Sequence, residues 1–182
     1  MARPLHDCGR YVRMLLPVLM LGGCVIPPSL SVDNADAGVD SPPSIVSARI
    51  DSVEITEPGP VTNGLGQSAQ LGLTLLDTDL SDTLYVRVFV DYNDPVLGQG
   101  ANPTPPRATC ATGNTKSAQR TATCDLTGLC QTEDVGQTRG MTIVVFDRQP
   151  QDTGTPLYQA MPDGSGGQST SRFYYLKCQP RT

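Results

Sequence analysis

The residues of this chain with the clearest chemical potential are its cysteines. Four of them lie in the second half of the sequence: Cys110, Cys124, Cys130 and Cys178. A zinc site is disfavoured, because no pair has Cys-x-x-Cys spacing and the only histidine, His6, lies close to the N-terminus. In an oxidising compartment an even number of cysteines is typical of disulfide bonds, and four cysteines allow three pairings. We therefore expect two disulfides.

Acidic side chains at the two ends of one apolar segment form a second group of candidate ligands. They are Asp77, Asp79 and Asp82 at one end and Asp91, Asn93 and Asp94 at the other. Their oxygens are of the hard type that calcium takes. The two groups lie about 12 residues apart, roughly 40 Å along an extended strand, so they cannot share one ion. Because aspartates in turns commonly bond to their own backbone, we expect no cofactor and keep Asp77, Asp79 and Asp82 as weak calcium candidates.

Catalytic chemistry is disfavoured by the residue types that the chain lacks. If His6 is removed with an export signal, Ser-His-Asp, Cys-His and imidazole-zinc sites become impossible. Neither Lys116 nor Lys177 lies in a Ser-x-x-Lys motif, and the acidic residues are scattered over turn-rich segments. The sequence therefore predicts a protein that is not an enzyme, with a hydrolase of unrecognised motif as the least favoured interpretation.

The N-terminal segment has the organisation of an export signal. Arg3, Arg10 and Arg13 precede the apolar run from Met14 to Leu21, and small residues follow. The run is far shorter than the roughly 20 residues that a membrane-spanning helix needs. The sequence Leu21-Gly22-Gly23-Cys24 resembles a bacterial lipobox, in which the cysteine receives a lipid and becomes the mature N-terminus. The resemblance implies a lipoprotein signal peptide at residues 1–23 and lipid, palmitate included, on Cys24.

The charge of the mature chain bears on its partners. Removing residues 1–23 takes away three arginines and Asp7, which changes the net charge from −5 to −7. An acidic chain whose only lysines are Lys116 and Lys177 lacks the cationic cluster that nucleic-acid binding needs. Attachment to the membrane is then left to the lipid on Cys24. Val25 follows that cysteine in place of the Asp that retains Gram-negative lipoproteins in the inner membrane, so the family rule implies the outer membrane of the cell envelope.

The remainder of the chain divides into a linker and a domain. Residues 25–43, after the lipidated Cys24, are rich in Pro, Ser, Asp and small residues and have no periodic apolar face, which predicts a disordered tether. From Ser44 to Thr182, short apolar runs alternate with Gly, Pro, Asn and Asp clusters, which predicts one all-β domain. Seven strands are expected: Ile45–Ile55 with a bend near Asp51, Gln67–Leu75, Thr83–Tyr92, Arg107–Cys110, Ala118–Asp125, Met141–Asp147 and Ser171–Cys178.

The strand LYVRVFVDY has the clearest alternation, with an apolar face of Leu84, Val86, Val88 and Val90. Leu71, Leu73 and Leu75 offer one matching face, and Met141, Ile143 and Val145 offer another, enough to pack two antiparallel sheets. The segment DTDLSDTLYVRVFVD resembles the entry to a strand in immunoglobulin-like and cadherin-like domains of bacterial surface proteins. It implies an immunoglobulin-like antiparallel β-sandwich of about seven strands, a fold that carries no activity with it.

Four further expectations follow from this sandwich. The loops Pro95–Pro106 and Pro150–Gly167 are expected at its rims. Arg87 and Asp91 are expected as a solvated surface pair. Phe173, Tyr174 and Tyr175 are expected to pack in the core and on the sheet face more readily than to bind a partner. Strand order brings Cys130 to Cys178 at one pole and leaves Cys110 to meet Cys124 across neighbouring strands of a hairpin.

Together these features predict a lipid-anchored outer-membrane protein with an interaction or structural role. Its partners are expected to be the membrane, through Cys24, and an envelope protein or glycan, with nucleic acid excluded. The alternative is a calcium-dependent adhesion or glycan-binding module.

The anchor gives the first testable prediction. Because the sequence has neither a membrane-spanning segment nor a basic membrane-binding cluster, Cys24→Ser should release the protein from membranes into the soluble fraction. Fractionation in high salt and carbonate measures this. Membrane association that persists in the variant contradicts the lipoprotein interpretation.

Overall fold

The strands of the domain form as the alternating apolar pattern predicts. A computed structural model describes residues 41–92, 103–113, 116–162, 164 and 166–181, so Cys24 and most of the linker lie outside the described residues. The strands are β1 (Ser44–Ile50), β2 (Val53–Glu54), β3 (Val61–Gly64), β4 (Gln70–Leu76), β5 (Tyr85–Val90), β6 (Ala108–Ala111), β7 (Gln119–Asp125), β8 (Thr138–Phe146) and β9 (Ser169–Gln179). One short 3-10 helix, η3 (Thr132–Asp134), precedes β8. Among the described residues, no helix is long and apolar enough to span a membrane.

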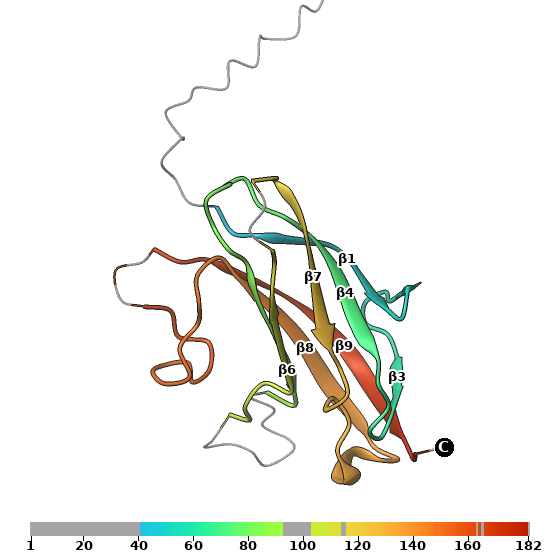
Figure 1. The fold of residues 1–182 in the computed structure, drawn as a ribbon. Helices are drawn as coiled ribbons and strands as arrows, with labels where there is room; N and C mark the ends of the chain where they lie inside the picture. Colours follow the sequence, from blue (N-terminus) through green and yellow to red (C-terminus); the bar gives the residue numbers. More distant parts are fainter. Residues whose placement is uncertain (1–40, 93–102, 114–115, 163, 165, 182) are drawn as a thin grey trace, which may run out of the picture. The chain divides into compact units, whose positions relative to one another are not determined.

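Two sheets pack into a sandwich (Figure 1). One has the order β2-β1-β4-β7 and the other β3-β9-β8-β5-β6, so the N-terminal part of the chain contributes β1 to one sheet and β3 to the other. The first strands of the chain thus divide between the two sheets, and β9, β8 and β5 lie side by side in the second sheet. Both features are those of the immunoglobulin-like arrangement. The predicted all-β sandwich is therefore confirmed, although β3 runs parallel to β9 and not antiparallel.

Seven of these strands match the predicted ones, and two short strands were not predicted. The expected strand Ile45–Ile55 is in fact a hairpin, because Asp51 and Ser52 have φ values of 47° and 72° and so form a two-residue turn between β1 and β2. β3, with the sequence VTNG, is too short and polar to give a periodic signal.

The core lies between the sheets where the alternating leucines and valines were expected to meet. Leu71, Leu73 and Leu75 on β4 face Met141, Ile143 and Val145 on β8 across the sandwich, and all six are buried. The inward face of β5, with Val86, Val88 and Val90, completes the same cluster. Burial of side chains of this size contributes roughly 1.5–3 kcal/mol each.

The outward face of β5 is also buried, although the alternation in LYVRVFVDY predicts only one apolar face. Residues 147–162, here called the cover segment, run over this face instead of lying at the rim of the sandwich. Phe89, Val144 and Phe146 form a second apolar cluster beneath Tyr158 and Met161 of the cover segment. The five-stranded sheet therefore has apolar packing on both faces.

Arg87 holds the cover segment in place. Its guanidinium donates hydrogen bonds to the carbonyls of Pro150 (2.8 Å), Gln151 (3.3 Å) and Tyr158 (2.5 Å) and pairs with Asp152 at 2.8 Å. The predicted solvated pair of Arg87 and Asp91 is therefore wrong, because both side chains are buried, 9% and 8% exposed. Asp91 instead accepts a hydrogen bond from Gly140 N and pairs with Arg139.

Two disulfides close the sandwich at different places. Cys110 on β6 pairs with Cys124 on β7, with Cα atoms 5.1 Å apart, and Cys130 pairs with Cys178 near the end of β9. This is the connectivity that strand order favoured. The expected hairpin geometry is wrong, however, because β6 and β7 belong to different sheets, so Cys110–Cys124 ties the two sheets together at their edge.

The disulfides should differ in their contribution to stability. In the chain-entropy model the Cys130–Cys178 bridge, with a sequence separation of 48, contributes roughly 4 kcal/mol. The Cys110–Cys124 bridge, with a separation of 14, contributes about 3 kcal/mol. We expect the Cys130→Ser/Cys178→Ser variant to unfold at a lower denaturant concentration than Cys110→Ser/Cys124→Ser. A reversed order in urea melts would show that closure of the sheet edge outweighs loop entropy.

Candidate functional site

The three calcium candidates lie in one turn between β4 and β5, and their carboxylates contact groups of the chain itself. Asp77 accepts a hydrogen bond from Asp79 N, and Asp79 accepts two from Ser81. Asp82 pairs with Arg148. Hydrogen bonds from Ser81 lower the pKa of Asp79, whereas burial raises the pKa of Asp77 despite the nearby positive charge of Arg120. These are the contacts of turn-forming aspartates.

Arg120 organises this turn from inside. It is almost fully buried and donates hydrogen bonds to the carbonyls of Ser117, Asp79 and Asp82, with Asp77 3.9 Å away. Within the described ranges, no group of three or more His, Cys, Asp or Glu side chains is arranged to hold a metal ion. Asn93 and Asp94, the second half of the predicted acidic set, lie outside the described residues.

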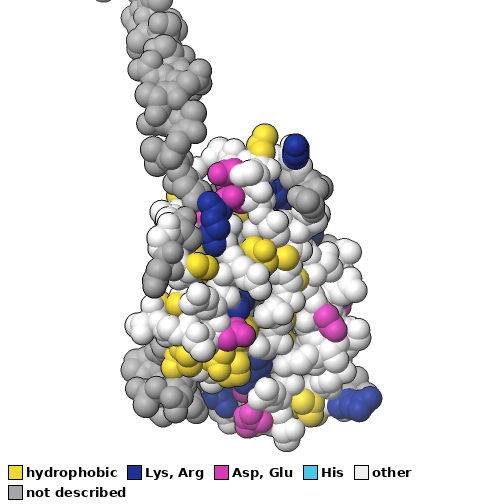
Figure 2. Space-filling model, turned by 60° about the vertical axis from the view of Figure 1, so that its left-hand side comes forward, with side chains coloured by type: hydrophobic (Ala, Val, Ile, Leu, Met, Phe, Trp, Pro, Cys, Tyr) yellow, Lys and Arg dark blue, Asp and Glu magenta, His cyan; other side chains and the backbone are white. Residues whose placement is uncertain are grey.

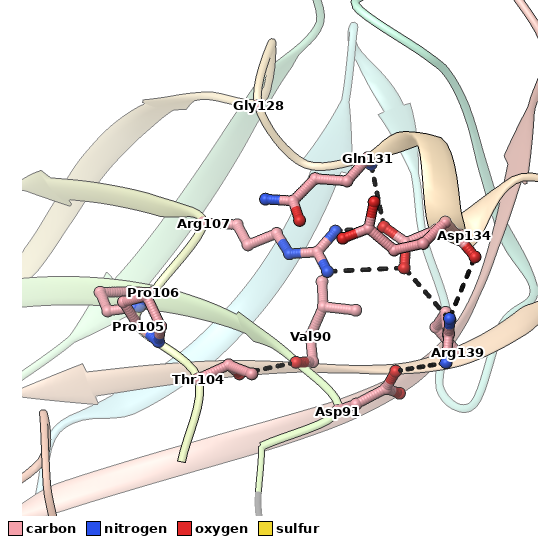
Figure 3. A pocket seen from close by; sticks show the side chains of 11 residues that line it. Val90, Asp91, Thr104, Pro105, Pro106, Arg107, Gly128, Gln131, Asp134 and Arg139 are labelled. Atoms are coloured by element: carbon pink, nitrogen blue, oxygen red, sulfur yellow. Dashed lines mark hydrogen bonds and ion pairs between the residues drawn. The ribbon is translucent and has the colours of Figure 1, made fainter. Parts of the chain in front are cut away.

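A polar cleft of about 480 Å³ lies at the opposite end of β5 (Figure 3). Its centre is Asp134 of η3, which is 1% exposed and forms ion pairs with both Arg107 and Arg139. The distance from Arg139 Nε to Asp134 Oδ1 is 3.1 Å. The backbone N–H of Gln131 donates to the same carboxylate at 2.9 Å. Arg139 also pairs with Asp91 at 3.2 Å. Asp91 and Asp134 therefore balance the charges of Arg107 and Arg139, and Glu133 adds a further carboxylate to the lining.

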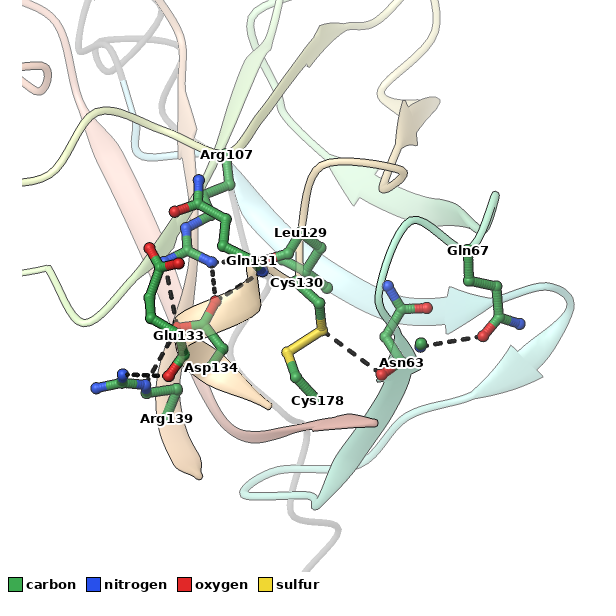
Figure 4. Close-up of a disulfide and its surroundings, with 11 residues drawn as sticks. Asn63, Gln67, Arg107, Leu129, Cys130, Gln131, Glu133, Asp134, Arg139 and Cys178 are labelled. Atoms are coloured by element: carbon green, nitrogen blue, oxygen red, sulfur yellow. Dashed lines mark hydrogen bonds and ion pairs between the residues drawn. A yellow bond between two sulfur atoms is a disulfide. The ribbon is translucent and has the colours of Figure 1, made fainter. Parts of the chain in front are cut away.

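The electrostatics of Asp134 follow from these contacts. Burial alone would raise its pKa, but the hydrogen bonds from Arg107 and Gln131 and the charges of Arg107 and Arg139 outweigh burial and hold the pKa below its usual value of 3.8. Figure 4 shows the Cys130–Cys178 disulfide between this network and Asn63 of β3. The bridge and the ion pairs together fix the chain on both sides of Gln131. The ion pairs of Asp134 with Arg107 and Arg139 thus stabilise the fold at this cleft, which Glu133 also lines.

The outward face of β8 and β9 beyond the cover segment carries exposed aromatic side chains, unlike the charged cleft. There, Phe173 and Tyr175 of β9 form an edge-to-face pair with ring centroids 5.2 Å apart, and they are 42% and 48% exposed. Tyr174, between them, points into the core and is fully buried. Tyr174 therefore packs in the core, whereas Phe173 and Tyr175 lie on the sheet face, where they contact each other and stay partly exposed.

A groove of about 320 Å³ adjoins the aromatic pair. We call it the hydroxyl groove, and its lining consists of Tyr92, Thr142, Val144, Pro156, Gln159, Ser169, Thr170 and Ser171. Thr142 is opposite Phe173 in the β8–β9 register, so the groove and the aromatic pair share one face. Burial raises the pKa of Tyr92 more than its hydrogen bond with Gln159 lowers it, and the Tyr92 hydroxyl donates to Leu157 O at 2.5 Å.

These residues differ in how clearly the sequence indicates them. Phe173 and Tyr175 stand in the predicted last strand, where a period of two places them opposite Tyr174. Arg107 and Asp134 leave no local pattern because they are 27 positions apart, and the pairing of Asp134 with Arg139 depends on the turn between η3 and β8. The run Ser169-Thr170-Ser171 is a usable sequence signal for a hydroxyl-lined surface.

The surface of the domain mixes both signs of charge. Figure 2 shows one face, on which the Lys and Arg side chains of the described residues lie among acidic ones and form no basic patch. The sheet order and the disulfides define a disulfide-bonded, immunoglobulin-like β-sandwich. No protein-family model matches the chain, and no curated protein sequence matches it.

Asp134 gives a prediction for pH dependence. Because its folded-state pKa is lowered, its contribution to stability is complete above the unfolded-state pKa of about 3.9 and is lost as pH falls through the folded-state value. We expect Asp134→Asn to lower the unfolding free energy by about 3 kcal/mol at pH 7, since two arginines lose a buried partner. The loss should shrink below pH 4. Exposed Glu54→Gln is the matched control, and urea melts from pH 2 to 7 measure both. An equal loss at every pH contradicts the assignment.

Proposed function

We propose that this chain is a non-enzymatic, lipid-anchored protein of the bacterial outer membrane whose β-sandwich binds another component of the envelope. The anchor rests on the lipobox resemblance at Cys24 and on the linker that follows it. The observation that best supports the binding role of the sandwich is the exposed aromatic pair Phe173 and Tyr175 beside the hydroxyl groove.

An aromatic pair in this position suits binding for a physical reason. Aromatic side chains bury large areas at little cost in conformational entropy, and they are enriched among the residues that dominate binding energy. Phe173 and Tyr175 leave much of this area in water although they stand on a rigid strand paired on both sides, with β8 and β3. Glu57 accepts a hydrogen bond from Phe173 N, and Pro58 O accepts one from Tyr175 N, which fixes the backbone further.

Support for a non-enzymatic role comes from how the ionisable groups are used. The carboxylate of Asp134 and the guanidiniums of Arg107 and Arg139 bond to one another at the cleft. Asp82 and Arg148 pair in the same way, and Asp79 is used in its own turn. Groups held in such pairs stabilise the fold and are poorly placed to transfer protons to a substrate.

Site-specific crosslinking tests this function. A photoreactive phenylalanine analogue at position 175 should capture an envelope component in intact cells. The same analogue at Val53, 69% exposed on β2, should capture little. Mass spectrometry of the adducts and gel shifts measure the outcome. Equal yields at both positions, or no adduct at either, contradict a binding surface around Tyr175.

A further inference from the structure

The hydroxyl groove has a composition that restricts its ligand. Among the described residues, those that line it are Thr142, Ser169, Thr170, Ser171, Gln159, Val144, Pro156 and Tyr92, and none of these is a Lys, Arg, Asp or Glu. A phosphate, a carboxylate or a charged peptide would lose its hydration there without gaining an opposite charge. The groove therefore favours an uncharged ligand that is rich in hydrogen-bonding groups.

The aromatic pair Phe173 and Tyr175 extends the same surface and adds apolar contacts to the hydrogen-bonding groups of the groove. Phe173 lies opposite Thr142 in the register, and Ser171 precedes it by two residues on the same face of β9. Gly140 makes room for the Phe173 ring, because a Cβ at that position would lie 3.0 Å from Phe173 Cε2. A ligand seated on the hydroxyls thus reaches a firmly placed aromatic ring.

The groove is preformed by the rest of the sheet. Its outer wall consists of Pro156 and Gln159 of the cover segment, which Arg87 holds through the carbonyls of Gln151 and Tyr158. Its floor consists of adjacent residues of β8 and β9, which are hydrogen-bonded along their length. At about 320 Å³ the groove is at the small end of the roughly 300–1,000 Å³ typical of ligand pockets, which suits one or two sugar rings better than a folded partner.

We infer that the ligand of this surface is a neutral saccharide chain, an inference that rests on the proposed binding function. A sugar ring has a rim of hydroxyls and two faces of C–H groups. Ser171, Thr142 and Gln159 would bond to hydroxyls of one ring, while the faces of Phe173 and Tyr175 would pack on the C–H groups of the next. A proline-rich peptide is the weaker match, because it needs slots between aromatic rings and the floor here is hydroxyl.

Retention on immobilised polysaccharides tests this inference with the detergent-solubilised full chain. Neutral glucan, mannan and galactan beads are compared with neutral polysaccharide extracted from the producing cell's own envelope. Charged polygalacturonate and a proline-rich peptide are the contrasting probes. We expect retention by at least one neutral polysaccharide and none by polygalacturonate. Stronger retention on the cell's own polysaccharide assigns the envelope as source, and stronger retention on the other beads assigns an external glycan.

Variants locate the binding. Tyr175→Ala and Gln159→Ala should each weaken retention at least ten-fold, while Leu80→Ala, an exposed side chain in the turn before β5, should leave it unchanged. Thermal melts verify that all variants fold. No retention on any neutral polysaccharide, binding of the peptide alone, or retention that these variants leave unchanged overturns the inference. A crosslink from position 175 to a protein, without polysaccharide binding, would refute the saccharide and leave the proposed function standing.

Discussion

The guanidinium of Arg87 joins two parts of the domain that would otherwise be independent. It lies on the outward face of β5, and its bonds to three carbonyls and Asp152 hold the cover segment against the sheet. Without that attachment, Phe89 and Phe146 would meet water and the hydroxyl groove would lose the wall that Gln159 supplies. Charge-assisted hydrogen bonds are the stronger kind, and here they stabilise a segment that has only one short β-bridge of its own. The second apolar layer and the candidate binding surface both depend on this interaction.

Buried charge is used in the same way at the two ends of the sandwich. Arg120 bonds to carbonyls of the turn between β4 and β5, and Asp134 gathers Arg107 and Arg139 beside η3. In each case a polar group is buried together with its partners, as the cost of an unpaired buried charge requires. Asp77, Asp79 and Asp82 take part in these contacts of the fold, whereas the described residues that line the hydroxyl groove carry no charge.

The sequence predicts most of the scaffold and little of the surface. Strands such as β4, β5 and β8 could be predicted because leucine and valine alternate along them, and each alternation reflects burial on one face. The cover segment could not, because residues 147–162 have no apolar period and are fixed by Arg87, more than 60 positions away. The placement of Arg87 beside Phe89 in one strand was the only local sign that the outward face is covered. Pairs such as Arg107 and Asp134 depend on the tertiary fold and leave no local pattern.

The attachment of β1 has a mechanical consequence if the chain is tethered through residues 25–43, as we propose. Tension transmitted through that linker enters the domain at Ser44, where β1 pairs with β4 along its length and Arg172 of β9 bonds to Ile45 O. A pull along β1 loads these bonds in parallel, so they must shear together and cannot open one after another. At the far end of β9 the Cys130–Cys178 bond prevents peeling of the strand that carries Phe173 and Tyr175. The sandwich would thus keep its shape while the proposed anchor and a ligand held at Phe173 and Tyr175 pull against each other.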